Sequence, residues 1–283
     1  YKFRNQWLET LAEDISQLRK EGKNIILVLS GAVATGCKYL QLNRKNLNVS
    51  QMAAIAAYGQ TYLINHLQEI FQKSDLKIAQ LLITSEDCQD RQRYLNMRQT
   101  ISKLAKFDII PIINENDSVT TSEIKFGDND QLSAQVSQLV SADLLILLSD
   151  VAGLYDKNPH IAKDAKLVKN VAKIDAKIHK LAGSSAKKFG SGGMKSKILA
   201  AEIATNSGAE VIIASGLIEN PLKKIADQEN HTLFNACKNA ISARENWLTH
   251  LKPSGKIHID AGAAKAVSSG KSLLAVGIVS VAG

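Results

Sequence analysis

The stretch from residue 114 to residue 159 constrains the fold of this chain more than any other. Two apolar runs border polar turns, one at Asn114 and one at Ser149-Asp150, and the helical pattern between them begins at an acidic turn, residues 127–130. In a parallel sheet such turns lie side by side at the carboxyl ends of the strands, where open α/β folds bind ligands. We therefore predict that this stretch forms the floor of an active site.

Strand and helix alternate along most of the remaining chain. Apolar residues at helical spacing and short apolar runs between turn residues distinguish the two. The predicted helices are Trp7–Leu18, Gln51–Gln72, Arg91–Leu104 and Ile198–Asn206, and the predicted strands are Ile25–Leu29, Leu76–Ile83, Ile109–Ile113 and Ala209–Ala214. This alternation predicts an α/β protein, a three-layer α/β/α sandwich around a mainly parallel sheet. Because proline lacks an N–H group, we expect Pro111 near a sheet edge or a bulge.

The overall composition is that of an ordinary globular protein. The chain has 283 residues, of which 45% are apolar and 22% charged, which suits one large α/β domain with a small appendage. No apolar run reaches the roughly 18 residues that span a bilayer. Three cysteines without paired spacing favour reduced thiols in the cytoplasm.

The net charge of +8 is compatible with nucleic acid or with anionic substrates as partners. The lysines are scattered along helical faces, so we favour a solvated basic surface over a nucleic-acid groove.

The last forty residues differ in pattern from the rest. Residues 256–260 and 277–282 alternate like short strands around an alanine-rich helix. So short a segment seldom forms a stable core by itself. We predict a main domain over residues 1–240, followed by a linker and the start of a small β domain over residues 241–283.

Three of the turns carry carboxylate and amide groups, and a fourth carries ammonium groups. In the fourth, Gly192-Gly193 precedes a helix whose first turn holds Lys195 and Lys197, a pattern that favours anion binding by backbone N–H groups, the helix dipole and mobile lysines. No P-loop, dinucleotide fingerprint, zinc-protease, nucleophile-elbow or protein-kinase motif occurs in the chain.

What remains fits transfer of a phosphoryl group to a small anionic acceptor. Two like charges about 4 Å apart repel by roughly 4 kcal/mol at an effective dielectric constant of 20, so the reactants need lysines, Mg²⁺ and helix N-termini around them. Simpler interpretations stay open at this point. Asp128 and Asp130 could only cap a helix, Lys195 and Lys197 could lie on a solvated face, and Ser30-Gly31 could be a plain tight turn.

Four blocks of sequence, in order, resemble the amino acid kinase family. They are S-G-A-V-A-T-G after a strand, I-N-E-N-D followed by K-F-G-D-N-D, L-L-S-D-V-A-G-L-Y-D-K-N-P, and G-S-G-G-M-K-S-K-I-L-A-A-E-I-A. Each block is short, but four at matching spacings are far more specific than one. The resemblance covers about residues 22–216, and the tail is similar to the run into a PUA domain.

The resemblance implies roles for individual residues. Ser30, Asp117 and Asn129 would hold the acceptor, Lys197 would stabilise charge on the transferring phosphoryl group, and Asp130 would orient the lysines. The residues expected to bind ATP are Ser149, Asp150, Ser191, Gly192, Gly193, Met194, Lys195, Ser196 and Lys197. Only the resemblance selects L-glutamate as the acceptor. It also implies the first step of proline biosynthesis, feedback inhibition by proline, a homo-oligomer, and Mg²⁺ held mainly through the ATP phosphates, with no protein metal site.

Two departures from the family pattern accompany the resemblance. Members of the family open with a strand and a K-x-G-[ST] loop whose lysine contacts the transferred phosphate, and no residue before Tyr1 supplies it. The PUA-like segment is also short. We expect a trimmed or partial chain that binds substrates and turns over poorly. Two alternatives remain: a sibling kinase acting on another carboxylate or carbamate, and a catalytically silent protein that binds RNA.

Overall fold

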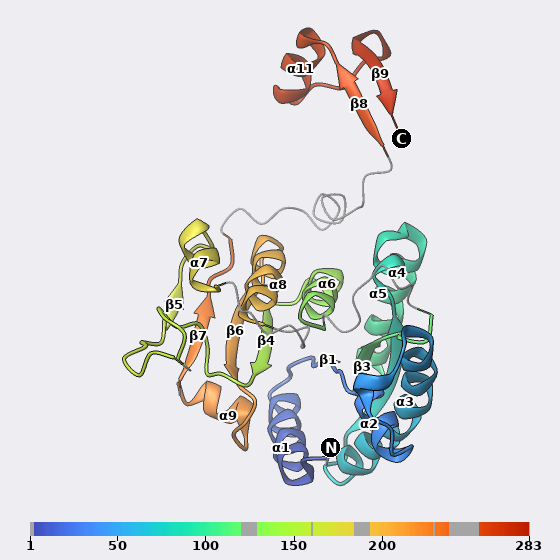
Figure 1. Cartoon of the computed structure of the whole chain (residues 1–283), viewed down its shortest axis with the longest axis vertical. Helices are drawn as coiled ribbons and strands as arrows, with labels where there is room; N and C mark the ends of the chain where they lie inside the picture. The colour runs from blue at the N-terminus through green and yellow to red at the C-terminus, as the bar shows by residue number, and fades with distance from the viewer. Residues whose placement is uncertain are drawn as a thin grey trace. The chain divides into compact units, whose positions relative to one another are not determined.

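The computed structural model describes residues 3–119, 129–159, 161–183, 193–228, 230–237 and 255–282. The chain forms two compact units, residues 1–246 and 247–283 (Figure 1). The helices are α1 (Asn5–Lys20), α2 (Ala32–Tyr39), α3 (Val49–Gln72), α4 (Ser85–Gln89), α5 (Arg91–Lys106), α6 (Asn129–Val140), α7 (Ala176–Leu181), α8 (Met194–Asn206), α9 (Pro221–Ala226) and α11 (Ala261–Ser268), with 3-10 turns η1 (Arg44–Asn46) and η2 (Ala275–Gly277). The strands are β1 (Leu27–Val28), β2 (Lys77–Ile83), β3 (Ile109–Glu115), β4 (Leu144–Ser149), β5 (Asn170–Val171), β6 (Glu210–Ser215), β7 (His231–Phe234), β8 (Lys256–Ile259) and β9 (Ile278–Ala282).

The strands of the first unit are mainly parallel, which confirms the predicted α/β class. They form two hydrogen-bonded sheets, one ordered β1-β3-β2 and one ordered β4-β6-β7-β5. In the first sheet every pair is parallel, and in the second only β6 and β7 run antiparallel. β1 is short, and no described strand hydrogen-bonds it to β4.

Helices connect the two sheets on both faces. α6 follows β3, precedes β4, and contacts β1, β3 and β4, while α1 contacts both α3 and α9 (Figure 1). Each sheet has its own apolar core. Fully buried Phe71 and Ile112 belong to the first core, and fully buried Ile198, Val211 and Phe234 belong to the second. The helices therefore cover the sheets as outer layers of an α/β/α arrangement.

Pro111 does not lie on an edge strand, contrary to our expectation. It pairs with Ala79 of β2 and belongs to β3, the central strand of its sheet. The N–H of Leu29 donates to the carbonyl oxygen of Ile113, and backbone groups alternate in direction along a strand, so the Pro111 nitrogen also faces β1. Pairing with β1 begins only at Ile112. The missing N–H group therefore falls where β1 has not yet joined the sheet.

The second unit contains β8, α11 and β9, as the pattern of short strands around an alanine-rich helix predicted. β8 and β9 pair antiparallel, and the carboxylate of Asp260 caps α11 by accepting from the N–H of Ala263 at 2.7 Å. The domain boundary predicted at residue 240 lies outside the described residues. Within the described part of the chain, no helix combines the length and apolar character needed to cross a membrane.

Candidate active site

The turn after β1 places Ser30 at the carboxyl end of the first sheet. Ser30 is exposed, and Gly31, the N-cap of α2, has a φ of 121°. Only glycine adopts this backbone region readily, so the sharp turn from strand to helix explains why the position is glycine. β1 and β3 are parallel neighbours, and the turn at Ser30 therefore lies at the same, carboxyl end of the sheet as the turn that follows Glu115, the last residue of β3.

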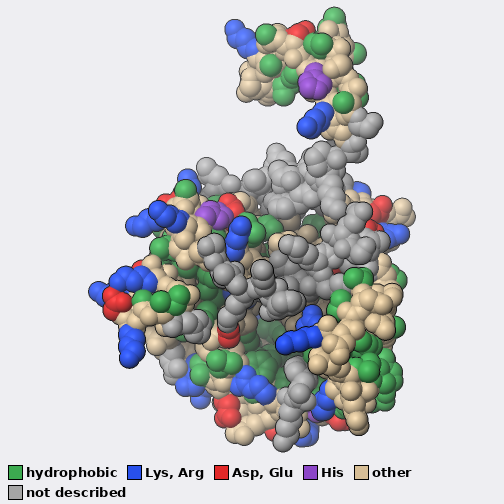
Figure 2. All heavy atoms as spheres, viewed as in Figure 1, with side chains coloured by type: hydrophobic (Ala, Val, Ile, Leu, Met, Phe, Trp, Pro, Cys, Tyr) green, Lys and Arg blue, Asp and Glu red, His purple; other side chains and the backbone are tan. Residues whose placement is uncertain are grey.

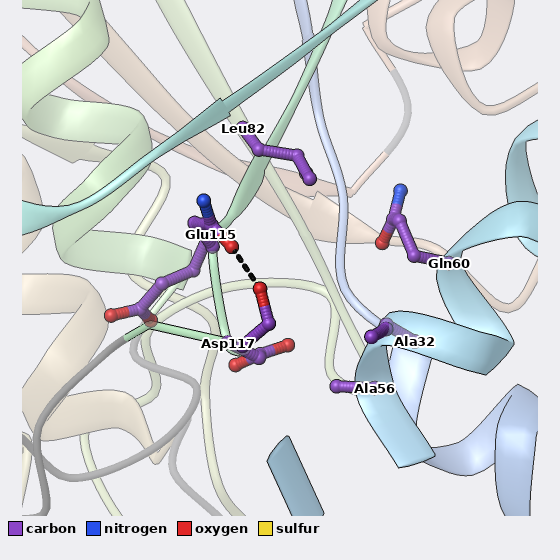
Figure 3. Close-up of a pocket in the computed structure, with 9 residues that line it drawn as sticks. Ala32, Ala56, Gln60, Leu82, Glu115 and Asp117 are labelled. Carbon is purple, nitrogen blue, oxygen red and sulfur yellow. Dashed lines mark hydrogen bonds between the residues drawn. The ribbon is translucent and has the colours of Figure 1, made fainter. Parts of the chain in front are cut away.

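A small pocket lies beside the end of β3. It holds about 180 Å³ of empty space, including the part open to solvent, less than the roughly 300–1,000 Å³ of pockets for drug-sized ligands. Its lining residues are Ala32, Ala56, Ala57, Gln60, Leu82, Glu115, Asn116, Asp117 and Ser118. Figure 3 shows Gln60 reaching in from α3 on one side, with Glu115 and Asp117 on the other. The pocket suits a small polar molecule.

Close contact between α2 and α3 forms one wall of this pocket. A Cβ atom on Gly59 would lie 2.0 Å from the carbonyl oxygen of Ala32, and one on Gly36 would lie 2.3 Å from that of Ile55. Two glycines facing each other therefore let the helices approach closely. α3 itself begins at a capping box formed by Asn48 and Gln51, which satisfies N–H groups of its first turn.

Burial affects the charge of Asp117, one of the two carboxylates that line the pocket. Burial raises the pKa of Asp117 above its ordinary value, and the nearby Arg44 guanidinium partly opposes this effect. A carboxylate that has lost water without gaining a full counter-charge favours a cationic ligand.

Gln60 is a pocket residue that the sequence analysis did not single out. Its side chain is buried, and its Oε1 accepts from the Nδ2 of Asn114 at 2.7 Å. The only signal in the sequence is a polar residue beside Gly59 on the inward stripe of α3, which also holds Leu63 and Leu67. Helical periodicity does not separate such a residue from a polar position at the border of the buried face.

Asp130 and Lys197, the two predicted catalytic residues, form an ion pair. The Lys197 Nζ atom donates to both carboxylate oxygens of Asp130, at 2.9 and 3.1 Å, and the two side chains are only 8% and 15% exposed. Lys197 belongs to α8 and Asp130 to the first turn of α6, and these helices contact each other. Asn129 lies next to Asp130, and its buried Oδ1 accepts from no donor among the described residues.

The other predicted residues lie at the end of β4 and the start of α8. The hydroxyl of half-buried Ser149 donates to the carboxylate of exposed Asp150 at 3.2 Å. Gly193 is the N-cap of α8, and Met194, Lys195 and Ser196 form its first turn, with the Lys195 side chain exposed. Ser191, Gly192 and Asp128 lie outside the described residues. β4 and β6 pair in parallel, so Ser149 and Ser215 lie together at the carboxyl end of the second sheet.

Comparison with known families accounts for both units. The model of the amino acid kinase family matches residues 4–215, and that of the PUA domain matches residues 255–283. The chain belongs to the amino acid kinase family. A solved isopentenyl phosphate kinase from T. acidophilum, with a TM-score of 0.52 and 13% identity over 82% of this chain and 91% of that one, has the same fold.

Curated relatives point to one branch of this family. The chain is 47% identical over 283 residues to the glutamate 5-kinase of Pelagibacter ubique, covering all of this chain and 77% of the relative. It is 45% identical over 281 residues to the glutamate 5-kinase of Nitrobacter hamburgensis, covering 99% of this chain and 74% of the relative.

Proposed function

We propose that this chain transfers the γ-phosphoryl group of ATP to the side-chain carboxylate of L-glutamate, giving L-glutamyl 5-phosphate and ADP, the first step of proline biosynthesis. The observation that carries the proposal is the identity of 45–47% with glutamate 5-kinases across nearly the whole chain. The pocket beside β3 and the buried pair of Lys197 and Asp130 lie in the part of the chain that the amino acid kinase model matches.

The acceptor carboxylate needs no general base. It is already ionised near neutral pH, since the ordinary pKa of a glutamate side chain is about 4.3. One of its oxygens attacks the γ-phosphorus in line, the bond between that phosphorus and the β-γ bridging oxygen breaks, and ADP leaves with the electron pair. Catalysis then depends on orientation and on neutralising charge.

Asp117, Asn129 and Ser30 are the proposed contacts for glutamate. The α-ammonium of glutamate would complete the counter-charge of half-buried Asp117. It could also donate to the Oδ1 of Asn129, which accepts from no donor among the described residues. The hydroxyl of Ser30 could donate to a carboxylate. The assignments of Asp117 and Asn129 rest on burial and on an unsatisfied polar atom, and that of Ser30 rests on its place after β1, at the carboxyl end of the first sheet.

Lys197 is the proposed contact for the transferring phosphoryl group. Its ammonium group is held by Asp130 in a mostly buried position, so that a cation already stands in place before charge develops on the phosphate oxygens. Asp130 acts through Lys197 and is a positioning residue. The start of α8 would add backbone N–H groups and the positive end of a helix dipole, and Ser149 and Asp150 would contact the nucleotide.

Use of ATP with magnesium follows from membership of the kinase family. Mg²⁺ usually keeps several waters and binds through substrate phosphates with one or two carboxylates. Two carboxylates lie near the proposed ATP contacts. Asp130 accepts from the ammonium group of Lys197, and Asp150 is exposed. This fits an ion held mainly by the ATP phosphates.

Two further properties are proposed alongside the activity: inhibition by proline and a homo-oligomeric state. The oligomer is supported by an exposed aromatic group on α2 and α3, in which Tyr39 stacks on Tyr62 with ring centroids 4.2 Å apart and Tyr58 contacts Tyr62. Light scattering with size-exclusion chromatography would test the oligomer, and ADP release with and without proline would test the inhibition.

A test of the activity measures ADP release with L-glutamate, N-acetylglutamate, aspartate and carbamate as acceptors, with hydroxylamine present. Hydroxylamine converts an acyl phosphate to a hydroxamate, so hydroxamate formation separates carboxylate phosphorylation from ATP hydrolysis. We expect glutamate alone to stimulate both readouts.

Stimulation by another acceptor would favour a sibling kinase, and salt-dependent RNA binding without acceptor-stimulated ADP release would favour the RNA-binding alternative. On the face drawn in Figure 2, Lys and Arg side chains lie in separate groups.

A further inference from the structure

A chain of hydrogen bonds fixes the orientation of the Gln60 amide. The backbone N–H of Glu115 donates to the Oδ1 of Asn114 at 2.9 Å, so the Nδ2 of Asn114 must be the group that faces Gln60. That Nδ2 donates to the Oε1 of Gln60 at 2.7 Å. The Nε2 of Gln60, with two N–H donors, is therefore the group left over, and it is buried without an acceptor among the described residues.

The unsatisfied donor belongs to a residue that lines the pocket. Gln60 is only 7% exposed, and its side chain points from α3 toward the pocket, on the side opposite Asp117 (Figure 3). A buried donor without an acceptor is costly, and a ligand oxygen in the pocket would satisfy it. The carboxylate of Asp117 and the Gln60 amide together offer a site for a cation and an anion side by side, as in an α-amino acid.

The two ends of the substrate glutamate would lie in different surroundings. The side-chain carboxylate must reach the phosphate near Lys197, on α8, whereas the pocket is built from α2, α3 and the ends of β2 and β3. The end that enters the pocket is then the α-amino acid end. Its ammonium group pairs with Asp117, and its α-carboxylate supplies the hydrogen-bond acceptor that the Gln60 amide lacks.

We propose that Gln60 is a specificity residue whose Nε2 donates a hydrogen bond to the α-carboxylate of the acceptor. This inference rests on the proposed function. It adds to that function a reason why the α-carboxylate itself, and not only the ammonium group, is recognised.

The variant that tests this proposal is Gln60→Glu. It keeps the shape of the side chain and an oxygen that accepts from Asn114, and it replaces the donor by a negative oxygen. The KM for L-glutamate should rise by roughly 10- to 100-fold, the range for loss of a hydrogen bond to a charged group, while the KM for ATP stays within about twofold. Gln68→Glu is the matched control, because Gln68 is an exposed residue of the same helix and the change of charge is identical. It should leave both constants unchanged.

L-isoglutamine, in which the α-carboxylate is an amide, separates direct contact from an indirect effect. A carboxylate at position 60 can accept from that amide but repels an α-carboxylate, so the ratio of kcat/KM for glutamate to that for isoglutamine should fall by roughly 10- to 100-fold in Gln60→Glu. If isoglutamine accepts no phosphoryl group, the ratio of the KM for glutamate to the inhibition constant of isoglutamine is used instead, and it should rise by a similar factor. Both ratios are independent of the fraction of folded enzyme, so partial misfolding does not mask the result.

The outcomes distinguish this inference from the proposed activity. If wild-type protein forms no hydroxamate with glutamate, the proposed function itself fails. Suppose that wild-type protein is active and that Gln60→Glu changes kcat but neither the KM for glutamate nor the ratio of kcat/KM for glutamate to that for isoglutamine. Gln60 then has only a structural role, and the inference is wrong. A raised KM together with a shifted ratio supports it.

Discussion

At the scale of single residues, the site is built from polar groups that the fold leaves incompletely satisfied. Lys197 and Asp130 form an ion pair, whereas Asp117 lacks a full counter-charge and, among the described residues, the Oδ1 of Asn129 has no donor. Such groups cost stability in the free protein, and substrates that supply the missing partner recover that cost on binding.

Replacing Lys197 by alanine should remove the cation that faces the transferring phosphoryl group. We expect kcat to fall by roughly 10²- to 10³-fold, the range for loss of one charge-stabilising donor, with the KM for glutamate nearly unchanged. Steady-state ADP release checks this, and a large rise in the KM for glutamate at normal kcat would contradict the assigned role. Since Asp130 loses its ion pair with Lys197 in a mostly buried position, Lys197→Ala should also lower stability. The double variant Lys197→Ala/Asp130→Asn should recover stability but not activity.

Replacing Asp117 by asparagine should affect binding and stability in opposite directions. Glutamate loses the counter-ion of its ammonium group, so its KM should rise while kcat changes little. The stability effect follows from the pKa of Asp117, which burial raises. A raised carboxyl pKa means that the folded state binds the proton more tightly than the unfolded state. The associated stability is therefore fully present only below the ordinary value of 3.8 and is lost as pH rises through the folded pKa.

We therefore expect Asp117→Asn to melt at a higher temperature than the wild type at pH 7.5 without glutamate, and this difference to shrink toward pH 4.5. Thermal unfolding followed by circular dichroism at the two pH values provides the measurement. An equal or lower melting temperature at pH 7.5 would contradict the burial argument.

At the scale of elements, side chains from α1 hold the segment that leads into α9. The buried carboxylate of Asp14 accepts from the N–H groups of Leu222 and Lys223, at 2.9 and 3.2 Å, and from the Nδ2 of Asn220 at 3.0 Å. In the described part of the chain, the side chain of Asn220, the N-cap of α9, makes no capping bond of its own. Asp14 thus caps a helix more than two hundred residues away in the chain, and it connects the layers that cover the two sheets.

Asp14→Ala should leave those N–H groups without an acceptor. We expect the free energy of unfolding to fall by roughly 1–3 kcal/mol, measured by urea denaturation. Glu13→Ala is the control, since Glu13 is the exposed neighbour on the same helix, and it should change stability by less than about 0.5 kcal/mol. Equal effects of the two variants would mean that the bonds from Asp14 contribute little.

Gly59→Ala should separate α2 from α3. The added methyl group would lie 2.0 Å from the Ala32 carbonyl oxygen and 2.4 Å from the Gly36 nitrogen, and both are backbone atoms that cannot move without moving α2. We expect a loss of roughly 1–3 kcal/mol of stability and a raised KM for glutamate, because Ala32 and Gln60 line the pocket. Unchanged urea denaturation together with an unchanged KM would show that the helix contact tolerates a wider spacing.

At the scale of the whole molecule, every described residue of the proposed site belongs to the first compact unit, residues 1–246. A chain that ends at Asn246 should therefore keep the KM values for glutamate and ATP within about twofold of those of the full chain, because no contact proposed for the substrates is removed. Steady-state kinetics of both chains would check this. A large rise in either KM would show that residues 247–283 take part in substrate binding.

Much of this architecture could be predicted from the sequence alone. Apolar spacing located the helices and strands to within a few residues, and glycines, acidic turns and lysines marked the segments that carry Asp117, Asp130 and Lys197. These features are local, because periodicity and turn chemistry report which face of an element is buried and where it ends.

Only the tertiary structure decided which side chains meet. The division of the strands into two sheets, the contact of Asp14 with Leu222, and the unsatisfied amide of Gln60 beside Asn114 all depend on segments far apart in the chain. Whether a buried polar group is hydrogen-bonded depends on the neighbours that packing brings to it, and the local sequence pattern does not identify those neighbours.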